Sequence, residues 1–292
     1  MAHAPLRIAA AGRIDPAARG LRVERFRPVD LADPPAVGEL LRNAPEPAVV
    51  NFAARTDVDR IESERPAGPS PRGGPAWTVN TDAVAAMARA AREGGKYLVQ
   101  ISTDFVYDGT DGPYSEEAPV APYSERLSWY GWTKSAAEAA VRAADPGALV
   151  LRIAYPYREH FPEKLDFARW MQARYREGTL PGLFADQQIT PTWIPDLTRA
   201  LPTLLERRTA GILHLASPSV TTPYEFGTAL LARPDGGAEI RPASLEASPA
   251  VPGRAPRPLR GGLRTDRALG LGLTLTPWRR GIQEILGERR GQ

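Results

Sequence analysis

The pattern most able to do chemistry in this 292-residue chain is a tyrosine followed four residues later by a lysine, Tyr130 and Lys134. On a helix, positions i and i+4 share one face, with their side chains about 5–6 Å apart at the base. A lysine ammonium beside a phenol favours the phenolate, so it would lower the pKa of Tyr130 from its usual value of about 10. The pair therefore predicts a proton donor or acceptor near neutral pH, and an exposed helix-surface pair is the alternative.

A second polar group follows the apolar run that begins at Tyr97. This run ends in Ser102, Thr103 and Asp104, and small hydroxyls at the carboxyl end of a parallel strand lie where open α/β sheets bind ligands. We expect a hydroxyl here to hydrogen-bond to a substrate oxygen. The alternative is that Ser102 and Thr103 only cap the strand and start a turn.

Composition removes several classes of chemistry. The chain has no cysteine, which excludes disulfides, thiolate metal sites and cysteine nucleophiles. Its three histidines lie far apart in the sequence, so we expect no metal site. The net charge is only +3 and the arginines are interspersed with acids, so we expect no nucleic-acid partner. We see no signal peptide and no run of about 20 apolar residues, which predicts a cytoplasmic protein without a membrane partner.

The elements that must position these residues alternate between apolar runs and helical patterns. This alternation is typical of an α/β protein with a parallel sheet and helices on both faces. We predict strands at 6–11, 21–26, 48–54, 96–102, 148–153 and 211–215, and helices at 35–43, 78–93, 130–144 and 164–177. From Tyr155 the pattern loosens, which indicates a smaller lobe that shapes a substrate cleft.

Taken in order, the motifs of this chain resemble a known family. Ser102 begins Ser-Thr-Asp-Phe-Val-Tyr-Asp-Gly, Gly112 begins Gly-Pro-Tyr-Ser-Glu-Glu, and Tyr130 begins Tyr-Gly-Trp-Thr-Lys. Together with Asn-Phe-Ala-Ala from Asn51 and Asp-Gln from Asp186, the series resembles the extended short-chain dehydrogenase/reductases. It is most similar to their dTDP-4-dehydrorhamnose reductase branch, over roughly residues 28–290. Since Asp104 is not followed by Glu, the dehydratase branch of nucleotide-sugar enzymes is disfavoured.

The resemblance implies a fold, a reaction and a set of residues. The fold would be a Rossmann-like doubly wound parallel sheet, formed by residues 1–155 and about 184–217. A smaller substrate-binding lobe would comprise residues 156–183 and 218–292. The reaction would be the NADPH- or NADH-dependent reduction of a 4-keto nucleotide sugar, and a homodimer is implied. The implied catalytic residues are Thr103, Tyr130 and Lys134.

Roles follow residue by residue from the same resemblance. Tyr130 would donate a proton to the carbonyl oxygen, Thr103 would hydrogen-bond to that oxygen, and Lys134 would lower the Tyr130 pKa and bind the nicotinamide ribose. The implied cofactor contacts also include Ala53 and Ala54 beside the dinucleotide and Asp30 and Leu31 near the adenine. Asp104 and Tyr155 would face the substrate, with an ordinary buried aromatic as the alternative for Tyr155.

One part of the family pattern is missing. Such a fold begins with a strand, a glycine-rich turn and a helix, whose N-terminus stabilises the cofactor's pyrophosphate. Here the first apolar run is followed by Gly12 and then by Pro16, so the first strand and its turn are missing or remodelled. Either the chain starts downstream of the family's usual beginning, which we favour, or the N-terminal segment is remodelled. A third option is a member that no longer binds a dinucleotide well.

Two other functions fit the same residues. A non-catalytic relative, similar to the regulatory subunit of methionine adenosyltransferase, would tolerate the loss of the glycine-rich turn. A nucleotide-sugar epimerase would use the same tyrosine and lysine and would hold its NAD through turnover. The affinity for a dinucleotide distinguishes the non-catalytic relative from a reductase. A cofactor that co-purifies with the protein would favour the epimerase.

Overall fold

A parallel sheet forms the centre of the molecule. The computed structural model describes residues 7–68, 71–160, 165–231, 239–248 and 254–287. The sheet has the order β3-β4-β5-β7, with β3 at Ala48–Asn51, β4 at Tyr97–Thr103, β5 at Leu149–Ile153 and β7 at Gly211–His214. β4 is buried along its whole length, as expected for a parallel strand that is covered on both faces.

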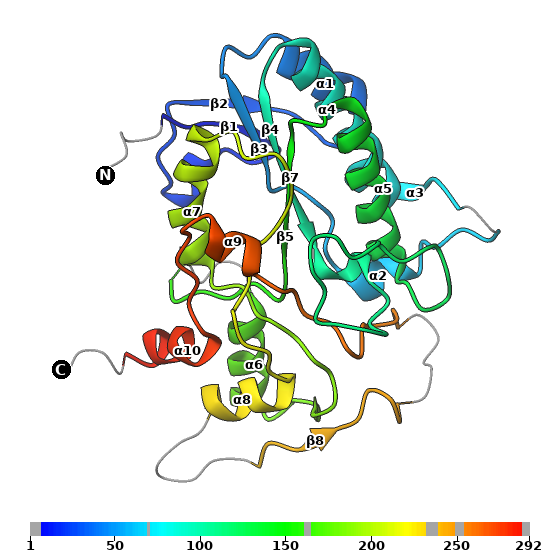
Figure 1. The fold of residues 1–292 in the computed structure, drawn as a ribbon, viewed down its shortest axis with the longest axis vertical. Coiled ribbons are helices and arrows are strands. Elements are labelled where there is room, and N and C mark those ends of the chain that lie inside the picture. The colour runs from blue at the N-terminus through cyan, green and yellow to red at the C-terminus, as the bar shows by residue number, and fades with distance from the viewer. Residues whose placement is uncertain (1–6, 69–70, 161–164, 232–238, 249–253, 288–292) are drawn as a thin grey trace.

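Helices cover both faces of this sheet (Figure 1). On one face lie α4 (Ala83–Glu93) and α5 (Trp129–Ala144), whose alanine-rich faces pack on Leu98 and Val150. On the other face, α7 (Ile194–Glu206) packs on Val99, Ile101 and Leu151. The alternation of side chains along each strand produces this division, because successive residues point to opposite faces. The carboxyl ends of β4 and β5 therefore emerge between the two helical layers.

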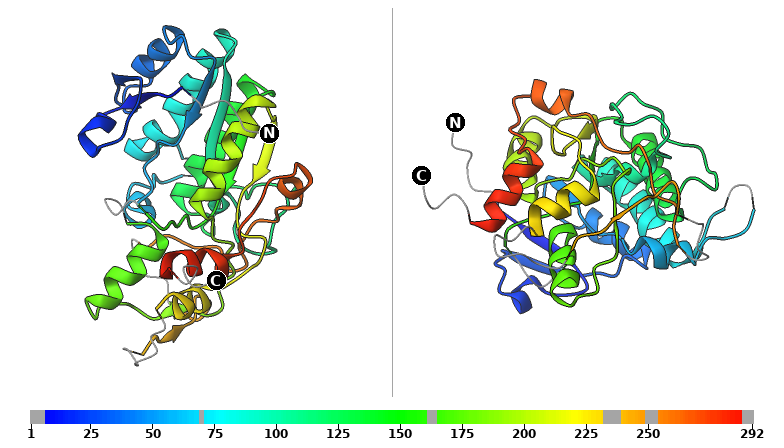
Figure 2. Two further views of the ribbon diagram at one scale, coloured as in Figure 1. Left: turned by 90° about the vertical axis from the view of Figure 1, so that its left-hand side faces the viewer. Right: turned by 90° about the horizontal axis from the view of Figure 1, so that it is seen from below.

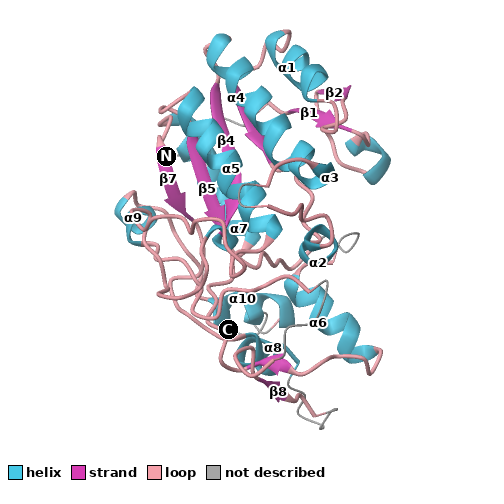
Figure 3. Cartoon of the chain, turned by 90° about the vertical axis from the view of Figure 1, so that its right-hand side faces the viewer, coloured by secondary structure: helices cyan, strands magenta, loops and turns pink. Residues whose placement is uncertain are grey.

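The N-terminal segment forms a separate small sheet. Strands β1 (Ala9–Gly12) and β2 (Arg25–Pro28) pair with each other in parallel and are joined through a short 3-10 helix, η1 (Pro16–Arg19). Figure 3 shows this pair beside the larger sheet. Helix α1 (Pro34–Arg42) connects β2 to β3 and packs on α4, which fastens the pair to the rest of the fold.

A second apolar core lies at the other end of the molecule. It is formed by α6 (Phe167–Arg176), α8 (Pro223–Leu231) and α10 (Trp278–Leu286), next to the short strands β6 (Leu183–Phe184) and β8 (Pro242–Ala243). Figure 2 shows these helices grouped away from the main sheet. The short helix α9 (Asp266–Gly270) instead packs on the α7 side of the sheet. No helix within the described ranges is both long and apolar enough to cross a membrane.

The predicted α/β architecture is confirmed, and the differences lie at element ends. The predicted helix at 78–93 begins earlier, as α3 (Gly74–Trp77) followed by a π-helical turn at Thr78–Asp82. The predicted strand at 48–54 ends at Asn51, and the predicted strand at 21–26 lies at Arg25–Pro28. Two predicted elements begin outside the described residues: the strand at 6–11 begins at Leu6 and the helix at 164–177 begins at Lys164. Neither Gly12 nor Gly20 opens an α-helix, so the first α-helix in the described part of the chain is α1.

Candidate active site

Helix α5 places Tyr130 and Lys134 at the carboxyl end of β4. The helix begins at Trp129 because Ser128 caps it, accepting a hydrogen bond from the Gly131 amide at 3.0 Å. The Glu62 carboxylate accepts a second bond from the Trp129 amide at 2.7 Å. Two of the amides that a helix start leaves without partners are thus satisfied, which fixes the first turn of α5.

Gly131 allows this turn to approach the loop after β4 very closely. A Cβ atom at position 131 would lie 2.0 Å from the carbonyl oxygen of Phe105, a distance that no real side chain tolerates. The glycine between the tyrosine and the lysine is therefore a steric requirement. It lets α5 contact the short helix η3 (Asp104–Val106) that follows Thr103.

Tyr130 is buried beside Phe105, with their ring centroids 5.9 Å apart. Burial raises the pKa of the Tyr130 phenol, and a hydrogen bond with the Thr103 side chain works against that rise. This differs from the expected lowering of the pKa by Lys134, because the Lys134 ammonium is bonded elsewhere. The phenol is protonated at neutral pH with or without this rise, and the rise makes it a weaker acid unless a nearby cation or hydrogen-bond donor stabilises the phenolate.

Lys134 is buried behind Tyr130, and its Nζ donates a hydrogen bond to the Ile101 carbonyl at 2.7 Å. Burial lowers the pKa of Lys134 to about 8, and the Glu138 carboxylate one turn further along α5 works against that fall. Glu138 is itself held by Arg152 of β5, at 2.9 and 2.6 Å. This bidentate pair is fully inside the protein and ties α5 to the central sheet.

Thr103 and Asp104 end β4 on the same side. The Thr103 hydroxyl donates to the Asp104 carboxylate at 3.3 Å and accepts from the Phe105 amide at 3.2 Å. Burial raises the pKa of Asp104 to about 7, which these hydrogen bonds only partly offset. In the described residues the hydroxyl oxygen of Ser102 is buried without a partner. The structure thus brings Thr103, Asp104 and Tyr130 together.

Tyr155 lies next to this group, directly after β5. Its ring centroid is 6.2 Å from that of Phe105, and its hydroxyl accepts a bond from Nε2 of Gln187 at 2.9 Å. Its φ angle is +41°, an unusual conformation for a bulky residue that a protein retains where the surroundings hold it. Sequence reasoning proposed that Tyr155 faces the substrate, but it contained no signal for the strained backbone.

The segment after β3 carries Ala53 and Ala54 towards α5. Its position depends on Asn80, whose side chain bonds to both the amide and the carbonyl of Arg55, at 2.8 and 3.1 Å. Asn80 also donates to the Thr133 hydroxyl at 3.1 Å. Asn80 lies in the π-helical turn, and such turns often occur at functional sites. No pattern in the sequence indicates this positioning role of Asn80, because it depends on contacts with Arg55 and Thr133.

Asp30 and Leu31 lie apart from the tyrosine and the lysine, in the turn after β2. The Asp30 carboxylate accepts a bond from the Ala32 amide at 2.9 Å, and Leu31 packs on the core between α1 and α4. The hydrogen bonds and ring contacts of the described residues do not join them to Tyr130 or Thr103. Their expected place near an adenine stays a prediction.

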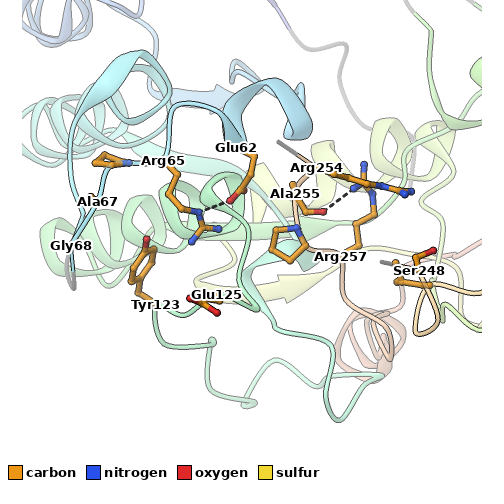
Figure 4. A pocket seen from close by; sticks show the side chains of 13 residues that line it. Glu62, Arg65, Ala67, Gly68, Tyr123, Glu125, Ser248, Arg254, Ala255 and Arg257 are labelled. Carbon is orange, nitrogen blue, oxygen red and sulfur yellow. Dashed lines mark hydrogen bonds and ion pairs between the residues drawn. The ribbon is translucent and has the colours of Figure 1, made fainter. Parts of the chain in front are cut away.

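An open cavity of about 750 Å³ lies beside the site, between the loop after α2 (Val58–Glu62) and the segment before residue 258. Figure 4 shows Arg65 and Tyr123 on one side of it and Arg254 and Arg257 on the other. Arg257 also raises the positive potential at Tyr155, which links the cavity to the group around Thr103. Its lining is mixed: three guanidinium groups suit an anionic ligand, and the carboxylates of Glu62 and Glu125 lie in the same lining.

These arginines were not predicted from the sequence. Arg65 is paired with Glu62, and Arg257 donates to Asp59 at 2.8 Å, so two of the three charges are partly balanced. Arg254 and Arg257 belong to the run Arg-Ala-Pro-Arg-Pro that begins at Arg254. Its two prolines restrict the backbone and could have indicated a loop of fixed conformation. No pattern in the sequence indicated which cavity this loop lines.

The later family motif has a structural role in this fold. Asp186 accepts bonds from the Leu245 amide at 2.7 Å and the Ser244 hydroxyl at 2.5 Å, which fixes the loop after β8. The Thr192 hydroxyl bonds to the Ala154 amide at 3.0 Å and to the Leu215 carbonyl at 2.8 Å. The Asp186 contacts fix a loop that lines the cavity through Leu245, and the Thr192 contacts join the segments after β5 and β7.

Comparisons with known proteins agree with this geometry. The profile of the RmlD substrate binding domain family matches residues 12–290. A dTDP-4-dehydrorhamnose reductase of Salmonella typhimurium is 31% identical over 270 residues, which are 89% of this chain and 85% of that one. Methionine adenosyltransferase 2 subunit beta of Pongo abelii is 31% identical over 272 residues, 90% of this chain and 76% of that one.

A similar fold is also found among solved structures. The crystal structure of dTDP-4-dehydrorhamnose reductase from Bacillus anthracis in complex with NADP superimposes with a TM-score of 0.76. The superposition covers 96% of this chain and 98% of that one, at 21% identity. At this identity the likeness concerns the fold, and it confirms the predicted Rossmann-like architecture.

Proposed function

This chain belongs to the RmlD substrate binding domain family, and from that premise we propose that it reduces the 4-keto group of a nucleotide sugar with NADPH or NADH. The observation that carries the proposal is the cluster at the end of β4. There Tyr130 and Thr103 share a hydrogen bond, and Lys134 is buried behind them. A proton donor, a hydroxyl partner and a nearby cation are the groups that a carbonyl reduction needs.

Each residue of the cluster has a distinct task in this proposal. When bound, the reduced nicotinamide supplies the hydride. The buried Tyr130 donates its phenolic proton to the carbonyl oxygen of the sugar. Thr103 donates a hydrogen bond to the same oxygen. Lys134 binds a ribose hydroxyl and, as a cation, stabilises the phenolate that Tyr130 becomes.

The residues fit the nicotinamide half of such a cofactor better than its phosphate half. Ala53 and Ala54 offer small side chains in the segment directly after β3, at the rim of the sheet. The phosphates would need a glycine-rich turn that leads into a helix N-terminus. In the described residues neither Gly12 nor Gly20 leads into such a helix. We therefore assign no residue of this chain to the pyrophosphate.

The arginine-lined cavity supplies the substrate side of the proposal. A nucleotide sugar carries a diphosphate, and guanidinium groups bind phosphate oxygens through paired hydrogen bonds. Arg65, Arg254 and Arg257 line the cavity, and the Arg65 guanidinium lies over the Tyr123 ring, 5.4 Å from its centroid. Arg257 lies nearest to Tyr155, so we place the diphosphate near Arg257 and the sugar towards Tyr130.

A turnover assay tests the proposal. We expect the purified chain to oxidise NADPH or NADH only when dTDP-4-dehydrorhamnose or a related 4-keto nucleotide sugar is added. Exchange of the sugar's configuration without net oxidation of the cofactor would instead favour an epimerase. Absence of both reactions, with stable binding to another protein, would favour the regulatory alternative. A cytoplasmic location and a homodimer also remain proposals.

A further inference from the structure

A buried polar cluster lies between α5 and the central sheet, behind the candidate active site. Arg152 of β5 and His214 of β7 are neighbours in the parallel register. Val150, two residues before Arg152, packs on the face of the sheet that α5 covers, so Arg152 points to the same face. Helix α5 reaches this row with Glu138, whose carboxylate Arg152 holds. A pair of opposite charges is thus enclosed between the helix and the sheet.

Arg152 is fixed in this enclosure by its hydrogen bonds. Its Nε and Nη2 donate to the two carboxylate oxygens of Glu138, at 2.9 and 2.6 Å. Its Nη1 donates to the Tyr107 hydroxyl at 2.5 Å and lies 3.4 Å from Nε2 of His214. Because Nδ1 of His214 donates to the Arg264 carbonyl at 3.1 Å, Nε2 is the acceptor in that contact. Both oxygens of Glu138 are therefore occupied by one rigid guanidinium group.

Lys134 lies one helical turn before Glu138, on the same face of α5. Its Nζ donates to the Ile101 carbonyl at 2.7 Å, and within the described ranges Lys134 forms no ion pair. One neutral acceptor does not offset the loss of water around a buried ammonium. Glu138 is the only acidic residue of α5, and its carboxylate works against the fall in the pKa of Lys134 that burial causes.

Arg152 determines how Glu138 acts on the lysine. A glutamate and a lysine four residues apart on a helix commonly pair with each other, and such a pair would use the donors of the ammonium. Here Arg152 occupies both carboxylate oxygens, so Glu138 acts on Lys134 through its charge alone. Two of the three Nζ donors of Lys134 therefore stay available to a ligand.

We propose that Glu138 is a positioning residue for Lys134: its carboxylate keeps the ammonium charged, and Arg152 holds that carboxylate so that it does not take up the ammonium donors. The arrangement suits a lysine that must bind a ribose hydroxyl and stabilise a phenolate while it is buried. This use of Lys134 rests on the proposed function. The effect of Glu138 on the charge of Lys134 does not, because it exists without any ligand.

The other titratable or charged side chains on the elements packed around Lys134 are Tyr130 of α5, Asp104 of η3, Glu62 of α2, Arg152 of β5 and His214 of β7. Helix α4 packs on α5 with apolar side chains. Glu62 is paired with Arg65, as Arg152 is with Glu138. Burial raises the pKa of Tyr130 and lowers that of His214 to about 3, so both are uncharged near pH 8. Burial raises the pKa of Asp104 to about 7, and this group is the same in every protein compared below.

Titration of the lysine NMR signals of the full chain tests the proposal without substrate or cofactor. The chain contains only three lysines, so ¹³C labelling at Cε gives three signals, and the signal lost in Lys134→Arg is that of Lys134. We expect its titration midpoint near pH 8 in the parent chain and about one pH unit lower in Glu138→Gln. Glu93→Gln makes the same change at an exposed site on α4, so it should leave the midpoint where it is.

A double variant keeps the test decisive where the single variant does not fold. Glu138→Gln leaves the buried guanidinium of Arg152 without its counter-ion, which is strongly destabilising. In Glu138→Gln/Arg152→Gln both charges are removed, and the two amides can bond to each other. We expect the midpoint of Lys134 to fall here by about half a pH unit, because the loss of a neighbouring cation offsets part of the loss of the carboxylate.

An unchanged midpoint in the double variant, or an equal fall in Glu93→Gln, would overturn the proposal. In a chain with reductase activity, the alkaline fall in kcat/KM should move together with the midpoint of Lys134 in each variant. A chain without that activity would contradict the proposed function, whereas the midpoints would still decide whether Glu138 keeps Lys134 charged.

Discussion

Tyr130 is buried at the end of β4, where burial raises the pKa of its phenol and a hydrogen bond with the Thr103 side chain works against that rise. In the Tyr130→Phe variant the ring and its packing on Phe105 remain, but the proton donor is lost. We expect the rate of turnover to fall by about a hundredfold or more, because positioned acid catalysis contributes factors of this size. Steady-state kinetics measure the change, and binding of a reduced dinucleotide to the variant is the control. Turnover close to that of the parent chain would exclude Tyr130 as the acid.

Lys134 should make the reaction depend on pH in the alkaline range. Burial lowers its pKa to about 8, so the ammonium is charged below that pH and loses its proton above it. Because the proposed roles of Lys134 need the charge, we expect kcat/KM to fall as pH rises through about 8. A Lys134→Arg variant keeps its charge at higher pH, so the fall should move upwards in whatever activity remains. The same fall in both proteins would assign it to another group.

Asp104 should make stability depend on pH. Burial raises its pKa to about 7 in the folded chain, above the ordinary aspartate value that holds in the unfolded chain. Between these two pKa values the folded state binds more protons than the unfolded state, so the free energy of unfolding falls as pH rises. Above pH about 7 the buried carboxylate of Asp104 is ionised, and its destabilising effect is then complete. We expect Asp104→Asn to remove this fall and to stabilise the protein at pH 8 by up to about 4 kcal/mol. Denaturant unfolding at several pH values measures it, and parallel curves for both proteins would contradict it.

At the scale of the elements, the close contact between α5 and η3 carries the active-site geometry. A methyl group on residue 131 would lie 2.0 Å from the Phe105 carbonyl, so Gly131→Ala must push the two elements apart. We expect a loss of about 1–3 kcal/mol in the free energy of unfolding, together with a drop in kcat as Tyr130 moves away from Thr103. Ala140→Gly, further along α5, is the control for helix propensity alone, and it should leave kcat unchanged. Equal effects on kcat from the two variants would show that the contact does not position Tyr130.

Element types follow from the sequence because their patterns are local, whereas the contacts between elements do not. The alanine-rich pattern predicted α5, and the motif order around Thr103 and Tyr130 predicted which residues meet. The role of Asn80 depends on a π-helical turn and on Arg55, which lies 25 residues away in the sequence. The pairing of Arg152 with Glu138 and the positive φ of Tyr155 likewise arise from three-dimensional packing. Such contacts leave no periodic signal in one chain.

At the scale of the whole molecule, the two halves of the proposed cofactor site differ in completeness. The half around Tyr130 rests on β4, β5 and α5, which are buried and tied together by Arg152 and Glu138. The other half adjoins β1 and β2, which form a separate small sheet and pair with each other among the described residues. Binding energy for a dinucleotide should therefore come mainly from its nicotinamide side.

Calorimetric titration measures this imbalance. We expect the Kd values of NADPH and NADH to lie within about tenfold of the Kd of reduced nicotinamide mononucleotide. The adenosine and the second phosphate would then contribute at most about 1.4 kcal/mol to the free energy of binding. Lys134→Ala removes a contact on the nicotinamide side, so it should weaken all three ligands equally, whereas Asp30→Ala should change none of them strongly. If the dinucleotides bound a hundredfold more tightly than the mononucleotide, the segment around β1 and β2 would hold the adenosine half in a remodelled site. Loss of that extra affinity in Asp30→Ala would then locate the adenosine half in the turn after β2.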